Sequence, residues 1–179
     1  MYDEGLIWLW GENGSGKTTF LKTLCGIIPV GSGTITVNGN DITLSDIQRR
    51  RVVYINQNTY FPHLDVEGHI KWAAKLRASR IPLQEVMDAF GIDYSGRVGR
   101  LSLGQKMRVA MATAFFGTPD VILLDEVIPS VSGQGEIFEH LSRLSARYSI
   151  DVIFVSQNIT DSHSGPIYIM KSGTMEKVR

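Results

Sequence analysis

Short, continuous apolar runs, separated by stretches in which apolar residues recur at helical spacing, set the pattern of this chain. A continuous apolar run is typical of a strand buried on both faces, as in the parallel sheets of α/β proteins. Such runs span residues 6–10, 52–55, 121–124 and 152–155. Strands that alternate with helices predict a mostly parallel sheet flanked by helices on both faces.

Helices are expected where apolar residues recur three or four positions apart and capping residues bound the stretch. The first follows Gly16 and stops at Gly26, and the next is capped by Asp65. A later one starts at an S-x-x-Q capping box formed by Ser102 and Gln105. After the first helix, the expected helices cover residues 66–77, 82–90, 102–116 and 135–148.

Hairpins are expected in two places, from period-two alternation and turn residues. Residues 33–39 alternate and end in Asn-Gly, and residues 167–178 contain a Ser-Gly turn. The first hairpin is predicted to form a reduced antiparallel part, and the section from about residue 59 to 116 a small helical insert. We therefore expect a single α/β domain over residues 1–179.

Composition is that of an ordinary folded protein, because 43% of the residues are hydrophobic and 20% are charged. Eighteen basic residues balance 18 acidic ones, so direct nucleic-acid binding is not expected. The one cysteine, Cys25, is predicted to be a buried apolar residue outside any disulfide framework. Because no apolar run has membrane length and the N-terminus lacks a signal-peptide pattern, we expect a cytoplasmic protein that reaches a membrane only through another chain.

The segment between the first strand and the first helix carries the clearest chemistry. Residues 11–18 have the sequence G-x-x-x-x-G-K-T, the phosphate-binding P-loop. Glycines let the backbone wrap a phosphate, Lys17 can reach the β- and γ-phosphates, and the Thr18 hydroxyl can hold Mg²⁺. The predicted nucleotide contacts are Gly11, Asn13, Gly14, Ser15, Gly16, Lys17, Thr18 and Thr19. A glycine-rich turn that binds nothing is the alternative.

Polar residues also follow two of the apolar runs. Gln57 closes the run at 52–55, and Asp125 and Glu126 end the run at 121–124. A carboxylate at the carboxyl end of a parallel strand beside the P-loop strand can orient Mg²⁺, and a neighbouring carboxylate can hold an attacking water. The alternative is a solvated Asp-Glu pair at a strand end.

The helix expected over 102–116 opens with Leu101-Ser102-Leu103-Gly104-Gln105. Its first-turn N–H groups need acceptors, and Gly104 would let a phosphate come close to them. A plain capping box is the alternative. In this order, the P-loop, Gln57, the 101–105 segment and the acidic strand end resemble the nucleotide-binding domain of ATP-binding cassette (ABC) ATPases over nearly the whole chain. The 101–105 segment is similar to that family's L-S-G-G-Q signature, with Leu103 in place of the first glycine.

This resemblance implies a P-loop NTPase fold that binds and hydrolyses ATP with Mg²⁺. It assigns metal contacts to Thr18, Gln57 and Asp125, and catalysis to Glu126 with Lys17. The signature residues Ser102, Leu103, Gly104 and Gln105 would face the γ-phosphate held by a second cassette. ATP would then lie between two cassettes, in a homo- or heterodimer assembled head to tail.

The sequence departs from the family pattern in several places. Gln157 stands where the family has a histidine that senses the γ-phosphate; we assign Gln157 to the catalytic set, although an amide cannot carry positive charge. Ser132 replaces the aspartate of the family's S-A-L-D segment. Only ten residues precede Gly11, so we expect no strong candidate for the family's adenine-stacking aromatic; Tyr2 is a weak one, and Trp8 and Trp10 are expected in the core. We therefore expect slow hydrolysis and weak ATP binding with little base selectivity.

Three functions fit these features. The leading one is the ATPase subunit of an ABC transporter, bound to a separate membrane-spanning subunit at the inner face of the cell membrane through the helical insert beside Gln57. The second is a soluble ABC ATPase acting on a macromolecule, although no coiled coil, zinc insert or second cassette is visible. The third is a degenerate cassette that binds ATP in a regulatory role with little turnover.

Overall fold

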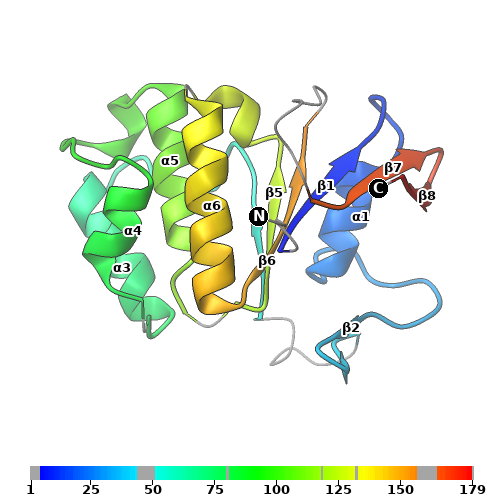
Figure 1. The fold of residues 1–179 in the computed structure, drawn as a ribbon. Coiled ribbons are helices and arrows are strands. Elements are labelled where there is room, and N and C mark those ends of the chain that lie inside the picture. The colour runs from blue at the N-terminus through cyan, green and yellow to red at the C-terminus, as the bar shows by residue number, and fades with distance from the viewer. Residues whose placement is uncertain are drawn as a thin grey trace.

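A mostly parallel sheet forms the centre of the computed structural model, which describes residues 5–43, 51–79, 81–117, 119–131, 133–156 and 165–178 (Figure 1). Within these residues the main sheet has six strands in the order β4-β5-β6-β1-β7-β8. They are β1 (Leu6–Trp10), β4 (Val52–Ile55), β5 (Val121–Asp125), β6 (Asp151–Val155), β7 (Ile167–Lys171) and β8 (Thr174–Lys177). Neighbours are parallel except β7 and β8. The four apolar runs are thus adjacent parallel strands, and the predicted α/β class is confirmed.

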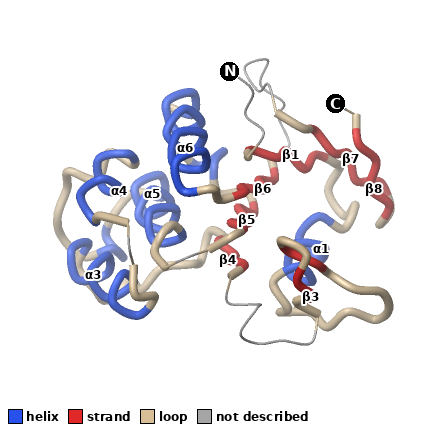
Figure 2. Tube along the Cα trace, turned by 60° about the horizontal axis from the view of Figure 1, so that its bottom comes forward, coloured by secondary structure: helices blue, strands red, loops and turns tan. Residues whose placement is uncertain are grey.

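Helices cover both faces of this sheet, as predicted (Figure 2). In the described segments, the α-helices are α1 (Lys17–Leu24), α3 (Val66–Leu76), α4 (Leu83–Ala89), α5 (Leu103–Ala114) and α6 (Gln134–Tyr148), and the short 3-10 helices are η1 (Val98–Arg100) and η2 (Ile128–Ser130). Successive side chains of a strand point to opposite faces. Trp8 therefore joins the larger apolar cluster, which includes Leu141 of α6, whereas Leu9 packs with Leu21 of α1 in the smaller one.

The helix starts follow the predicted capping chemistry. The Asp65 carboxylate accepts a hydrogen bond from the Gly68 N–H (2.6 Å) at the start of α3. At the start of α5, the Ser102 hydroxyl accepts from the Gln105 N–H (3.2 Å), and the Gln105 side chain accepts from the Ser102 N–H (3.0 Å). This reciprocal pair confirms the capping box and holds the first turn of α5 in a fixed orientation.

Both predicted hairpins are present. Strands β2 (Thr36–Val37) and β3 (Asn40–Asp41) are antiparallel and joined at Asn38-Gly39, and β7 and β8 are joined at Ser172-Gly173. All four turn residues have positive φ, between 47° and 81°. That geometry matches the right-handed twist of the strands, which explains the Asn-Gly and Ser-Gly pairs.

Helices α3, α4 and α5 gather on one side of the molecule, away from α1 (Figure 1). Helix α5 packs against α3 and also against β4, so it joins the helical part to the sheet. The single domain over residues 1–179 with an insert at about 59–116 stays a prediction.

Cys25 differs from the expectation of a buried residue. It is half-buried after the last turn of α1, where it packs at the margin of the smaller apolar cluster. Burial raises the pKa of its thiol, and the thiol donates a weak hydrogen bond to the Lys22 carbonyl oxygen (3.4 Å). No helix in the described part of the chain is long and apolar enough to cross a membrane.

Candidate functional site

The P-loop connects β1 to α1 and has the backbone geometry that its glycines predict. Gly16 has a φ of 107°, which is strained for any residue with a Cβ. A Cβ on Gly11 would lie 2.4 Å from the Met170 carbonyl oxygen. Only glycine therefore lets the start of the loop pack this closely against the backbone of β7. The Gly173 N–H donates to the Ser15 carbonyl oxygen (2.9 Å). The C-terminal hairpin therefore supports the loop that would hold a phosphate.

Lys17 is buried, with 6% of its surface exposed. Its ammonium group donates to the carbonyl oxygens of Gly11 (2.7 Å) and Glu12 (2.8 Å) and lies 3.4 Å from the Ser15 hydroxyl oxygen. Among the described residues no carboxylate forms an ion pair with it. A buried cation held only by neutral groups favours the approach of an anion. The ammonium therefore lies inside the loop that would wrap a phosphate.

Asp125 lies at the carboxyl end of β5 and is 6% exposed. Its Oδ1 accepts a hydrogen bond from the Thr18 hydroxyl (3.2 Å), and its Oδ2 accepts one from the Tyr54 hydroxyl (2.6 Å). The structure therefore brings together two predicted metal contacts, Thr18 and Asp125. Sequence reasoning missed Tyr54, because no motif marks it and its contact depends on the pairing of β4 with β5.

This donor set fits Mg²⁺. The described residues contain no cluster of three or more His, Cys, Asp or Glu side chains. Mg²⁺ does not require one, because it is bound through one or two carboxylates together with phosphate oxygens and waters. The Thr18 hydroxyl at the start of α1 and the Asp125 carboxylate oxygen at the end of β5 lie 3.2 Å apart and are suitable ligands beside a phosphate.

Glu126 follows Asp125 in the left-handed region, with a φ of 56°. Positive φ is uncommon for a residue with a long side chain and concentrates at functional sites. Glu126 lines a cavity of about 190 Å³ with residues of the P-loop, namely Asn13, Gly14, Gly16, Lys17, Thr18 and Thr19. The Gln57 side-chain amide donates to the Glu126 carbonyl oxygen (3.2 Å). Gln57, Asp125 and Glu126 also line an adjoining cavity of about 180 Å³ with Thr18.

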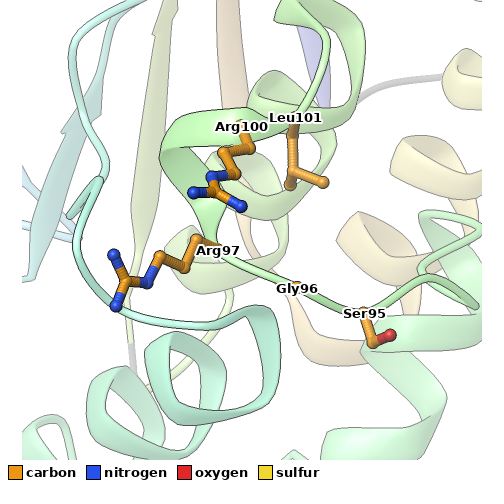
Figure 3. Close-up of a pocket in the computed structure, with 5 residues that line it drawn as sticks. All are labelled: Ser95, Gly96, Arg97, Arg100 and Leu101. Atoms are coloured by element: carbon orange, nitrogen blue, oxygen red, sulfur yellow. The ribbon is translucent and has the colours of Figure 1, made fainter.

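The signature residues lie elsewhere on the molecule. Ser102 and Leu103 are exposed at the start of α5, and in the described part of the chain neither lines the three cavities that P-loop residues line. The residues that precede Ser102 in the sequence line a separate cavity of about 600 Å³. They are Ser95, Gly96, Arg97, Arg100 and Leu101 (Figure 3). Among the residues that the structure describes, the signature therefore lies apart from the P-loop cavities.

The remaining expectations have different outcomes. Gln157 and Ser132 lie outside the described residues. Trp8 is fully buried, as expected. Trp10 is only half-buried: it packs against the core and also lines a cavity of about 380 Å³ with residues 12–15 of the P-loop and residues 170–172. The prediction of a core position for Trp10 was therefore incomplete.

Known proteins are similar to this chain in sequence. The family model described as ABC transporter matches residues 1–128. The chain is 34% identical over 166 residues to the molybdenum import ATP-binding protein ModC of Methylococcus capsulatus, covering 86% of this chain and 46% of that protein. It is 32% identical over 181 residues to the Fe(3+) ions import ATP-binding protein FbpC of Photobacterium profundum, covering 94% and 51%. The chain thus spans about half the length of the curated relatives it matches.

Solved structures agree on the fold. The structure of cbiO1 from Clostridium perfringens, described as part of the ABC transporter complex cbiONQ, has a TM-score of 0.80 and 24% identity, covering 96% of this chain and 75% of that one. A putative ABC transporter ATP-binding protein from Pyrococcus furiosus has a TM-score of 0.77 and 21% identity, covering 93% of this chain and 84% of that one.

Proposed function

Because the chain belongs to the ABC transporter family, we propose that it is the ATP-binding and ATP-hydrolysing subunit of a transporter and drives transport through a separate membrane subunit. The family resemblance drawn from the four motifs is confirmed by these relatives. The observation that carries the proposal is the convergence of Lys17, Thr18, Asp125, Glu126 and Gln57 around the P-loop cavities. Names of import proteins among the relatives favour a transporter over a soluble ABC ATPase acting on a macromolecule.

ATP binding would begin at the P-loop. The N–H groups of the loop and of the first turn of α1 surround the phosphates, and the helix dipole favours their negative charge. The Lys17 ammonium, held by the carbonyl oxygens of Gly11 and Glu12, would exchange those contacts for phosphate oxygens. Bound Mg²⁺ would neutralise charge on the phosphates, and Thr18 and Asp125 are the residues that would hold it, with Gln57 as a further contact.

Hydrolysis would depend on Glu126. Glu126 lines the same cavity as Lys17, and its carboxylate would orient a water toward the γ-phosphate and accept a proton from that water. The hydrogen bond from Gln57 to the Glu126 carbonyl oxygen links this residue to the connection that leads into the helical part. Gln157 would donate a hydrogen bond to the γ-phosphate. Since an amide has no positive charge, we propose slow turnover rather than none.

A second cassette would complete the site. The N-terminus of α5, with exposed Ser102 and Leu103, is a surface on which the phosphates of a second cassette could dock. The separation of this surface from the P-loop of the same chain supports a head-to-tail dimer. Either a second copy or a different cassette could be the partner.

The membrane subunit would bind beside Gln57. Phe61 and Trp72 are exposed and stack edge to face with ring centroids 4.7 Å apart, and Leu76 is exposed one turn further along α3. Exposed apolar side chains in one patch are typical of a protein interface. We name these three residues the aromatic patch, and we propose that this chain lies at the cytoplasmic face of the membrane, bound to the membrane subunit.

Positive charge lies close to the aromatic patch. The loop that carries Arg97 packs against the loop after Phe61, because the Val98 N–H donates to the Leu64 carbonyl oxygen (2.9 Å) and the Gly99 N–H to the Pro62 carbonyl oxygen (3.0 Å). Figure 3 shows the side chains of Arg97 and Arg100 extending to the same side of this loop. Neither forms an ion pair with a described residue. The docking segment of the partner is therefore proposed to carry apolar and acidic side chains.

Co-purification from detergent-solubilised membranes of the host tests this proposal. The tagged wild-type chain should retain a multi-span membrane protein in near-equal amount, and Trp72→Ala should lose it because an apolar anchor of the interface is gone. Met175→Ala is the matched control, since Met175 is a similarly exposed apolar residue on β8. Recovery of the wild-type chain without any membrane protein would contradict the transporter function.

A further inference from the structure

We infer that Tyr54 is a positioning residue for the metal site, because it holds Asp125 in the orientation in which this carboxylate can ligate Mg²⁺. The inference rests on the proposed function, in which Asp125 and Thr18 bind Mg²⁺ beside ATP. It adds a residue that lies outside every motif of the sequence and that would act on the metal only through Asp125.

Sheet register explains why Tyr54 reaches Asp125. Strands β4 and β5 are parallel, with Tyr54 beside Leu123. Residues two apart on a strand share a face, so Asp125 points to the same face as Leu123 and Tyr54. This is the face that α1 covers, because Leu123 and Tyr54 both pack in the cluster that contains Leu21. Tyr54, Asp125 and the start of α1 therefore converge at one edge of the sheet.

The two carboxylate oxygens of Asp125 accept hydrogen bonds from two different hydroxyl groups. Oδ2 accepts from the Tyr54 hydroxyl at 2.6 Å, and Oδ1 lies 3.2 Å from the Thr18 hydroxyl oxygen. With Oδ2 occupied, Oδ1 is the oxygen directed at the residue that would share the metal. A hydrogen-bonding partner that fixes the orientation of a ligating side chain commonly changes metal affinity when it is removed.

The phenol suits this role because it remains a donor. The phenol of a tyrosine carries its proton at neutral pH, because its ordinary pKa is about 10, and here the hydroxyl donates to Asp125 Oδ2 at 2.6 Å. A phenylalanine ring would fill the same space without the proton. Asp125 would then keep the hydrogen bond from the Thr18 hydroxyl to Oδ1 but lose the donor that holds Oδ2, in a residue that is 6% exposed.

Mn²⁺ titration followed by electron paramagnetic resonance tests the inference without relying on hydrolysis. The protein is saturated with a non-hydrolysable ATP analogue, and free Mn²⁺ is measured for wild type, Tyr54→Phe and Tyr148→Phe. Tyr148 is the matched control, because its hydroxyl also donates to a carboxylate, Glu85 (2.7 Å), on another part of the molecule. Tyr54→Phe should bind Mn²⁺ about tenfold more weakly, whereas Tyr148→Phe should match wild type. Analogue binding in EDTA should be unchanged in both variants.

Wild-type Mn²⁺ affinity in Tyr54→Phe would overturn the inference. Tyr54→His restores an N–H donor and should recover most of the affinity, whereas an equal loss in both variants would assign the effect to packing and overturn it as well. If Tyr54→Phe does not fold, Tyr54→His alone decides, with near-wild-type affinity in favour and a tenfold loss against. Asp125→Asn distinguishes a failure of the inference about Tyr54 from a failure of the proposed function. Undiminished Mn²⁺ binding in that variant would refute the assignment of Asp125 as a metal ligand.

Discussion

Replacing Glu126 by glycine separates backbone strain in the site from the chemistry of the carboxylate. The φ of 56° places Glu126 in the left-handed region, where the Cβ of an L-residue crowds the next carbonyl oxygen at a cost of about 1–2 kcal/mol. Glycine avoids that contact, but its greater conformational freedom in the unfolded chain lowers the free energy of unfolding by about 0.5–1 kcal/mol. Glu126→Gly should therefore unfold with a free energy about 0.5–1 kcal/mol higher than Glu126→Ala.

Urea denaturation of the two variants measures this difference directly, because both lack the carboxylate. In a domain of this size the corresponding rise in melting temperature is about 1–4 °C. Ser149 provides the matched control: it is exposed, has a φ of 54° and lies at the end of α6, away from the P-loop. Ser149→Gly should gain over Ser149→Ala by a similar amount.

A gain at position 149 without a gain at position 126 would refute the idea that Glu126 is held under strain. ATP hydrolysis is measured on the same variants. Glu126→Gly should be more stable than Glu126→Ala and should still not hydrolyse ATP. Wild-type hydrolysis by Glu126→Gly would show that the strained position serves some purpose other than catalysis.

The other predictions concern the surroundings of the site. Burial lowers the pKa of His69, whose Nε2 accepts a hydrogen bond from the Phe61 backbone N–H (3.1 Å). The stability that neutral His69 contributes should therefore be present above its unfolded pKa of about 6.5 and be lost as pH falls below it. Urea denaturation of wild type and His69→Asn at several pH values would measure this loss. Ser102→Ala should lose about 1 kcal/mol through the missing cap of α5, measured by the same method, and Ser102→Thr should retain most of it. Gly11→Ala should lose about 1–3 kcal/mol because its Cβ would overlap the Met170 carbonyl oxygen, whereas Gly31→Ala, with open space around it, should change little.

Much of the fold follows from local patterns in the sequence. The apolar runs predicted buried parallel strands because only strands covered on both faces dispense with polar alternation. Asn38-Gly39 and Ser172-Gly173 marked hairpin turns because those residues tolerate positive φ. The order of the strands was not predictable in this way, since pairing between β4 and β5 joins segments about 70 residues apart, and no local signal encodes it.

The candidate site was predictable where a motif exists and not where the contact is purely spatial. Lys17 and Thr18 were predicted because phosphate binding needs these residue types at fixed places in the P-loop, and Asp125 and Glu126 were predicted because they end a buried strand. Tyr54 was missed because its role depends on which strand lies beside β5. The apolar run at residues 6–10 likewise did not predict that Trp10, at the end of β1, would be only half-buried.

Hydrolysis of Mg-ATP by the purified chain tests the central claim most directly. Wild type is compared with Glu126→Gln and with Glu139→Gln, which makes the same change at an exposed position on α6. We predict measurable hydrolysis by wild type and Glu139→Gln and a loss of about 10²-fold or more in Glu126→Gln, because an amide cannot accept a proton from the attacking water. Equal rates in all three proteins would contradict the assignment of this site as the centre of ATP hydrolysis.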